Sequence, residues 1–152
     1  MIGRLRPDRR HSGEQGSAVV EFVTLGVLLL VPLIYLVLTV ARIQAGAYAV
    51  SMAAREAGRA FVTAADEGSA FARADSAATI TLEDHRFQPE EAEVSIMCST
   101  SPCLTPGATV RVEARVSVPL PLIPLFARDV LPLEVPVSAD AVATVDSYRA
   151  AP

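Results

Sequence analysis

The chain has few histidines, the residue that enzyme active sites use most often for general acid–base catalysis. None of its 13 basic residues is a lysine, and its two histidines are His11 and His85. With so few imidazole groups, general acid–base catalysis has little to work with. The sequence also contains no phosphate-binding loop, no nucleophile elbow and no His-Glu-x-x-His pattern. We therefore expect no enzymatic activity, no cofactor and no small-molecule substrate.

Most of the chain also lacks an excess of positive charge. The formal net charge of the whole chain is −4. Residues 1–16 hold four arginines against two acidic residues, so this leader carries +2, and subtracting it from the total leaves −6 for residues 17–152. A basic surface for nucleic acid is therefore absent from residues 17–152, and no nucleic-acid partner is expected.

Charged residues are missing from a run of 20 residues, 22–41. At about 1.5 Å per helical residue, this run covers the hydrocarbon thickness of a bilayer, about 30 Å. Its Leu, Val, Ile and Phe residues contribute about −4 to −8 kcal/mol toward membrane insertion. We therefore expect a transmembrane helix over residues 17–41. Because four arginines precede it, the positive-inside rule places residues 1–16 in the cytoplasm and residues 42–152 outside.

A cleaved secretory signal is an alternative interpretation of this segment. The small residues Ala45-Gly46-Ala47 would suit a signal peptidase and would release a soluble domain. However, the apolar run is longer than a usual signal core, and Arg42 and a continuing helical pattern follow it. These features favour a retained anchor in the cell membrane.

Helical periodicity continues beyond the apolar run. Val50, Ala54, Ala57 and Phe61 fall on one face, whereas polar residues fall on the other. The pattern predicts that the membrane helix extends to about Thr63. The Ala-rich stretch 69–82 predicts a second, shorter helix after the interruption at residues 66–68.

After residue 89 the apolar pattern changes to a period of two. Apolar residues alternate with polar ones over residues 93–98, again over 110–118, and again over about 133–145, which predicts three strands. Pro106-Gly107 indicates a turn between the first two. We expect an α+β fold in which the outer half of the long helix packs on a small antiparallel sheet of about three strands, since such a sheet alone is marginally stable.

A proline-rich apolar stretch, residues 119–126, separates the second and third strands. It contains too many prolines to join the interior of a sheet. It is expected to be either a packed loop or a surface that faces lipid or a partner.

The two cysteines, Cys98 and Cys103, flank four residues of a turn-rich connection. An even cysteine count in an external domain favours a structural disulfide, and the spacing differs from that of a Cys-x-x-Cys redox motif. Two reduced thiols and half of a zinc site are the alternatives, although no second ligand pair completes such a site. His85 and its acidic neighbours form another conceivable metal cluster. Their spacing fits a solvated loop better, so no metal is expected.

The junction between the leader and the apolar helix carries the most specific motif. It reads Glu14-Gln15-Gly16-Ser17-Ala18-Val19-Val20-Glu21-Phe22: a basic leader ends in Gly, and an acid is the fifth residue of an otherwise apolar helix. This pattern resembles the class III signals of type IV pilin-like proteins. With Leu30-Val31-Pro32-Leu33, it is most similar to the TadE-like family of bacterial Tad (Flp) pilus-assembly pseudopilins. The cysteine loop, the Pro-rich stretch and the ending Val145-Asp-Ser-Tyr-Arg149 are also similar.

The resemblance implies a pilin-like fold and a role in pilus assembly. A prepilin peptidase would cut between Gly16 and Ser17 and leave the helix on the mature protein. Glu21, followed by Phe22, would pair with the N-terminal amine of a neighbouring subunit. The partners would then be the membrane, the peptidase, and other pilins or Tad assembly proteins. Two other interpretations remain: Glu21 merely reaches the membrane interface at the start of the helix, and the chain is a signal-anchored extracytoplasmic binding module.

Overall fold

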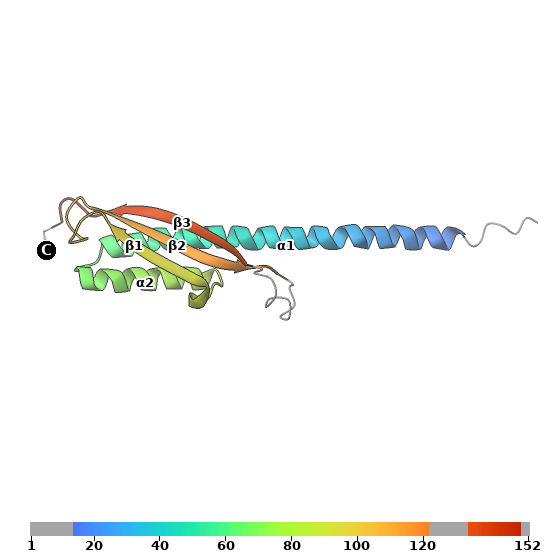
Figure 1. The fold of residues 1–152 in the computed structure, drawn as a ribbon, viewed down its shortest axis with the longest axis horizontal. Helices are drawn as coiled ribbons and strands as arrows, with labels where there is room; N and C mark the ends of the chain where they lie inside the picture. The colour runs from blue at the N-terminus through green and yellow to red at the C-terminus, as the bar shows by residue number, and fades with distance from the viewer. Residues whose placement is uncertain (1–13, 122–133, 150–152) are drawn as a thin grey trace, which may run out of the picture. The chain divides into compact units, whose positions relative to one another are not determined.

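The computed structural model describes residues 14–121 and 134–149 and has an α+β fold (Figure 1). The expectation of a long helix with a small antiparallel sheet is confirmed. The chain divides into two units, Met1–Val37 and Leu38–Pro152. The helices and strands, in chain order, are α1 (Glu14–Val62), α2 (Glu67–Asp84), the short 3-10 helix η1 (Pro89–Glu91), β1 (Ala92–Cys98), β2 (Thr109–Pro119) and β3 (Glu134–Thr144).

The observed elements agree closely with the periodicities of the sequence. Helix α1 ends at Val62, one residue before the predicted end, and α2 is longer than the predicted 69–82 by two residues at each end. The three strands lie where alternation of apolar and polar residues predicted them. Residues 1–13 of the predicted leader and residues 122–126 of the proline-rich stretch lie outside the described residues.

The first unit contributes the apolar part of α1. Every side chain from Ala18 to Ile34 is exposed, and Pro32 lies inside the helix without ending it. Within the described ranges, α1 is the one helix that is long and apolar enough to cross a membrane. The structure is therefore consistent with single-pass anchoring through this helix.

The second unit is a two-layer domain. Its sheet has the order β1-β2-β3 with both pairs antiparallel, and the C-terminal part of α1 and helix α2 cover one face (Figure 1). The central strand buries alternate side chains, which share one core with residues of both helices. The buried residues of β2 are Val110, Val112, Ala114, Val116 and Val118. As expected, the sheet buries its apolar face against the helical stripe that begins in α1.

Small residues allow α1 to approach this sheet closely. The buried helix face carries Gly46, Ala49, Ala53 and Ala57. A Cβ atom added at Gly46 would lie 2.6 Å from Cγ2 of Val118, which is closer than van der Waals contact permits. Because valine is stiff at χ1, the neighbour has little freedom to move aside. Gly46 is therefore required by the packing of the helix on the sheet.

We predict that Gly46→Ala destabilises the domain although alanine favours helix. Overpacking costs about 1–3 kcal/mol, and the gain in helix propensity recovers part of this, so the free energy of unfolding should fall by about 1–2 kcal/mol. The control is Gly26→Ala, because a Cβ at Gly26 meets no atom within 4 Å. Denaturant unfolding of the full chain in detergent measures both. Equal stability of the two variants would contradict the observed close approach.

The two ends of α2 have defined caps. At its start, the side chain of Asp66 accepts a hydrogen bond from the backbone N–H of Ser69 at 2.8 Å. At its end, Arg86 adopts a positive φ of 64°, and the N–H of Phe87 returns to the carbonyl of Leu82 at 3.0 Å. The second arrangement is a Schellman motif in which arginine takes the place usually held by glycine. Local chemistry thus sets both boundaries of α2.

The Asp66 cap predicts a dependence of stability on pH. The backbone N–H of Ser69, and then its hydroxyl, hold the pKa of Asp66 below its ordinary value of 3.8. The folded state therefore binds fewer protons at this carboxyl than the unfolded state, so the stabilisation is present above the ordinary pKa and is lost as the pH falls through the folded pKa. Asn at position 66 retains a capping oxygen but does not titrate.

We expect wild type to keep its stability advantage over the Asp66→Asn variant from about pH 6 down to about pH 5 and to lose it progressively as the pH falls below the ordinary pKa of 3.8. Unfolding of both proteins across this range measures the difference. A difference that stays constant with pH would show that the charge of Asp66 contributes nothing.

The C-terminal end of α1 is capped by a distant residue. The guanidinium of Arg149 donates to the carbonyl of Val62 at 3.2 Å and to the carbonyl of Ala65 at 2.6 Å. The last carbonyls of a helix have no partner within the helix, and a cation there also suits the helix dipole. Arg149 therefore ties the segment after β3 to the end of α1.

Replacing Arg149 by alanine should lower the free energy of unfolding by about 1–3 kcal/mol, because two charge-assisted hydrogen bonds are lost. Arg149→Lys should be intermediate, since an ammonium lacks the planar fork that reaches both carbonyls. The exposed Arg59, in the last turn of α1, provides a control with the same loss of charge at the same helix end. If Arg59→Ala and Arg149→Ala are equally destabilising in thermal unfolding, the two hydrogen bonds have no special role.

Candidate functional site

The predicted processing site lies in the first turns of α1. The helix begins at Glu14, so the backbone at Gly16 and Ser17 is already helical. The first N–H groups of a helix have no intrahelical partner and give this end a partial positive charge. A cut between Gly16 and Ser17 would leave a new amine at the start of the remaining helix. The N-terminus of the mature protein would then coincide with the N-terminus of α1.

Glu21 lies four residues after Ser17, about one helical turn or 6 Å further along the axis, and close to the same face. Its side chain is exposed, and it makes no hydrogen bond or ion pair with any residue in the described part of the chain. The nearby hydroxyl of Thr24 donates to the carbonyl of Val20 at 2.7 Å. The carboxylate is therefore exposed and without a partner among the described residues.

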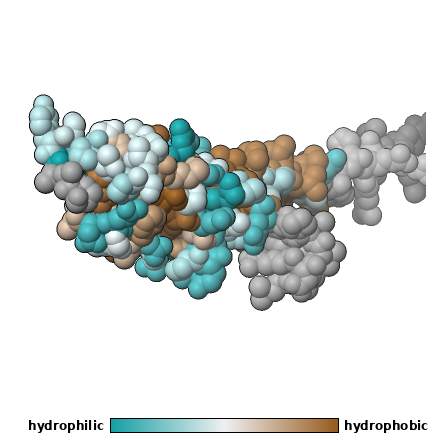
Figure 2. All heavy atoms as spheres, turned by 60° about the vertical axis from the view of Figure 1, so that its left-hand side comes forward, coloured by the Kyte–Doolittle hydropathy of each residue, from teal (hydrophilic) through white to brown (hydrophobic). Residues whose placement is uncertain are grey.

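Phe22 follows Glu21 and starts the uncharged run. Its side chain is 77% exposed, and large apolar side chains are exposed on all sides of the following turns. Figure 2 shows a continuous hydrophobic surface along the part of α1 in view, whereas the domain's surface in that view is mostly hydrophilic or neutral. Residues 18–37 thus present an acid at one end and an apolar surface along the rest, which suits both lipid and other apolar helices.

The predicted disulfide between Cys98 and Cys103 is present, with the two Cα atoms 5.3 Å apart. It closes the connection between β1 and β2. In the same connection, Gly107 has a φ of 76°, and the N–H of Ala108 donates to the carbonyl of Thr105 at 3.0 Å. These are the features of a type II turn with proline and glycine at its centre, as the sequence predicted. The disulfide closes the loop of the β1–β2 hairpin. Its two sulfurs are bonded to each other and are therefore not free to bind a metal.

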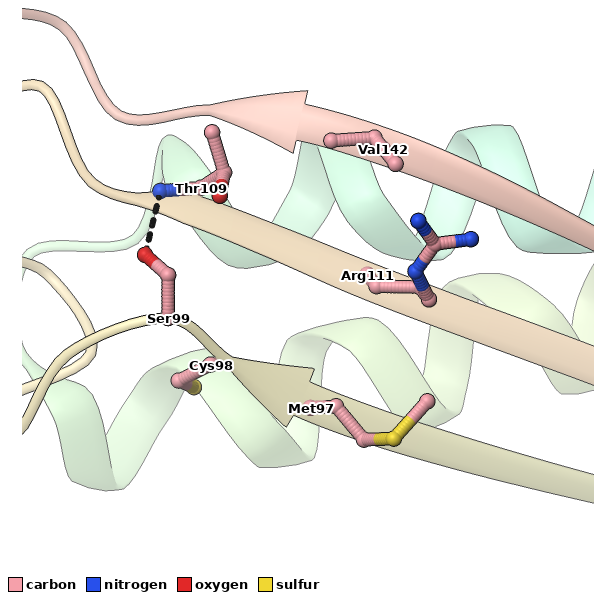
Figure 3. Close-up of a pocket in the computed structure, with 6 residues that line it drawn as sticks. All are labelled: Met97, Cys98, Ser99, Thr109, Arg111 and Val142. Atoms are coloured by element: carbon pink, nitrogen blue, oxygen red, sulfur yellow. Dashed lines mark hydrogen bonds between the residues drawn. The ribbon is translucent and has the colours of Figure 1, made fainter.

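A shallow groove lies on the open face of the sheet near this hairpin (Figure 3). Met97, Arg111 and Val142 form a row across three neighbouring strands and point to the same side. Arg111 forms an ion pair with Asp140, and the N–H of Thr109 donates to the hydroxyl of Ser99 at 2.9 Å. The guanidinium of Arg111 and the hydroxyl of Ser99 thus already have partners within the chain, so the groove offers few free polar groups to a ligand.

The acidic neighbourhood of His85 does not form a metal site in the described residues. His85 caps the end of α2, and Glu91 accepts a hydrogen bond from the N–H of Gln88 at 3.1 Å in η1. Residues 14–121 and 134–149 contain no group of three or more His, Cys, Asp or Glu side chains arranged to hold a metal ion. The expectation that the chain is not an enzyme stays a prediction.

Two arginines have structural roles that the sequence did not reveal. Arg149 caps α1, as described above. The guanidinium of Arg42 lies over the ring of Phe87, 4.5 Å from its centroid, and donates to the carbonyl of Arg86 at 3.2 Å. The partners of both arginines are more than 40 residues away in the sequence. No local sequence pattern could therefore have predicted these two contacts.

Comparisons with protein-family models, with curated proteins and with solved structures find no match to this chain.

Proposed function

We propose that the chain is a membrane-anchored minor pilin or pseudopilin that takes part in the assembly or initiation of a Tad (Flp) type IV-like pilus. The observation that carries this proposal is the exposed Glu21, which has no partner among the described residues and lies one helical turn after the Gly16-Ser17 junction. A long exposed apolar helix follows it, joined to a small α+β domain.

The steps of the proposed function follow from the chemistry of this site. Residues 1–16 stay in the cytoplasm, residues 17–41 cross the membrane, and the domain 42–152 lies outside. A prepilin peptidase removes the leader after Gly16 and exposes the amine of Ser17. An unpaired carboxylate near hydrocarbon costs up to about 3 kcal/mol, and pairing with the ammonium group of a neighbour offsets part of this cost. Assembly is thereby favoured over the isolated protein.

Release at Ala45-Gly46-Ala47 fits the domain poorly. Gly46 is buried against the sheet, and Arg42 contacts Phe87. A cut after Ala47 would remove both contacts from the domain. The retained helix is therefore part of the folded structure as well as its anchor.

Deletion of this chain from its native cells, followed by complementation, tests the proposal. The deletion strain should lose surface pili, counted by electron microscopy and in the sheared fraction, while the major pilin stays in the membrane. Expression of the full chain should restore them. Normal pili in the deletion strain would overturn the proposal and favour a signal-anchored binding module.

A further inference from the structure

One corner of the second unit is apolar although it lies at the surface. A shallow depression there is lined by α1 on one side and by the end of β2 on the other. Leu38, Ala41 and Ala45 come from the helix, and Pro119, Leu120 and Pro121 come from the end of the strand. Arg42 is the one charged group in this lining. We refer to these seven residues as the apolar corner.

The apolar corner is level with the end of the uncharged run. Val118 packs beside Gly46, and the next residues, 119–121, reach back along α1 to the turns that contain Leu38 and Ala41. Ala41 is the last residue of the run 22–41. Since that run spans about 30 Å of hydrocarbon, Ala41 falls at the boundary between the hydrocarbon and the headgroups.

The residues of the corner suit this boundary. Pro119 and Pro121 carry no backbone N–H, so two donors that would be costly near hydrocarbon are absent. Leu120 is only half-buried within the chain. Arg42 packs its guanidinium on Phe87 and bonds the carbonyl of Arg86, so its charge is held at the level of the headgroups.

Electrostatic attraction to anionic lipids would contribute little to binding at this surface. Arg42 and Arg86 lie close to the acidic end of α2, where Glu83 and Asp84 are exposed. The corner is thus apolar apart from Arg42, and the nearby Glu83 and Asp84 offset the positive charge of Arg42 and Arg86. Contact with a bilayer through these residues should not require anionic lipids.

We propose that the apolar corner is seated in the outer interface of the bilayer that α1 crosses, so that the domain rests on the lipid surface at residues 119–121 and at Leu38, Ala41 and Ala45. This inference rests on the membrane crossing of α1 and does not depend on a role in pili. It accounts for an apolar depression at the surface of the second unit, lined by residues of α1 and of the end of β2.

Fluorescence quenching tests this seat directly, because the chain contains no tryptophan. The full-length L120W variant carries a single reporter at the corner. In vesicles of neutral phosphatidylcholine with brominated acyl chains, its emission should be shifted to the blue and quenched. Quenching should be stronger with bromine near the headgroups than with bromine near the chain ends. The A45W variant places the reporter on the helical side of the same depression. It provides a second measurement in case L120W does not fold.

Two further variants serve as matched controls. L30W lies inside the run 22–41 and should be quenched best by bromine deep in the bilayer. M97W lies on an exposed position at the other end of the sheet, paired with Arg111, about 26 Å from Pro119 along β2. It should remain unquenched.

The proposal is overturned if L120W and A45W behave like M97W while L30W is quenched. It is also overturned if L30W is not quenched, because α1 then does not cross the bilayer. A blue shift at position 120 that bromine leaves unquenched, and that vanishes when the protein is diluted in lipid, would assign the corner to a second copy of the chain instead. None of these results depends on pilus production. Failure at L120W and A45W alone leaves the pilus proposal standing, and loss of the pilus role leaves the lipid contact standing, whereas an unquenched L30W would contradict both proposals because both need α1 to cross the membrane.

Discussion

Replacing Glu21 by leucine is expected to abolish pilus production while the protein remains folded, inserted and as abundant as wild type. Glu21 is the only charged residue between Ala18 and Ala41. Its removal should make insertion easier by up to about 3 kcal/mol. The domain should be unaffected, since its core begins at Ala49, and distant sites contribute independently to stability. Stability should therefore hold or rise.

Assembly should nevertheless fail, because the amine of Ser17 on a neighbouring subunit loses the carboxylate that compensates its charge. Glu21→Asp should give intermediate numbers of pili, since the charge remains and its reach shortens by one methylene. Thr24→Leu is a matched control. It replaces a polar side chain in the next turn by the same apolar one and should leave pili unchanged.

Pili counted by electron microscopy, with membrane abundance measured in the same cells, give the readout. Normal pili with leucine at position 21 would mean that Glu21 only reaches the membrane interface. That result would favour the signal-anchored binding module.

The second large effect is expected at Gly16. A bulky residue there, as in Gly16→Leu, should stop removal of the leader because the peptidase needs a small residue at the junction. Insertion should be normal, since it depends on the run 22–41 and the leader arginines. Folding should not suffer either, because Gly16 lies in the first turns of α1, where leucine is a better helix former than glycine.

Electrophoresis of membrane fractions measures this effect. Wild type should migrate faster than Gly16→Leu by the mass of a 16-residue leader. Gly26→Ala is the control. It changes another glycine of the same helix, at which an added Cβ would meet no atom within 4 Å, and this variant should be processed normally. If wild type and Gly16→Leu migrate together, the prepilin interpretation loses its main support.

Much of the fold could be predicted because its elements repeat simple patterns. The alternation in β2, from Val110 to Val118, shows directly in its buried positions. Likewise, Val50, Ala54, Ala57 and Phe61 are all fully buried on the predicted face of α1. The disulfide followed from two cysteines in one short connection. In each case, neighbours in the sequence determine the feature.

Features that depend on distant partners could not be predicted. The need for glycine at position 46 comes from Val118, and the role of Arg149 comes from carbonyls 84 and 87 residues away. An exposed arginine and a capping arginine look alike in the sequence. At the junction, the motif identified Glu21, and the structure adds that its carboxylate is exposed and has no partner within the described residues. Under the proposed function, the amine that would pair with it belongs to a neighbouring subunit.

The N-terminal residue of the mature protein tests the central proposal most directly. The protein should be purified from native membranes and its N-terminus determined by sequencing and by intact mass. The account predicts that it begins at Ser17, with the leader removed after Gly16 and the helix retained. A chain that begins at Met1 would contradict processing by a prepilin peptidase, and one that begins near Tyr48 would show release of a soluble domain.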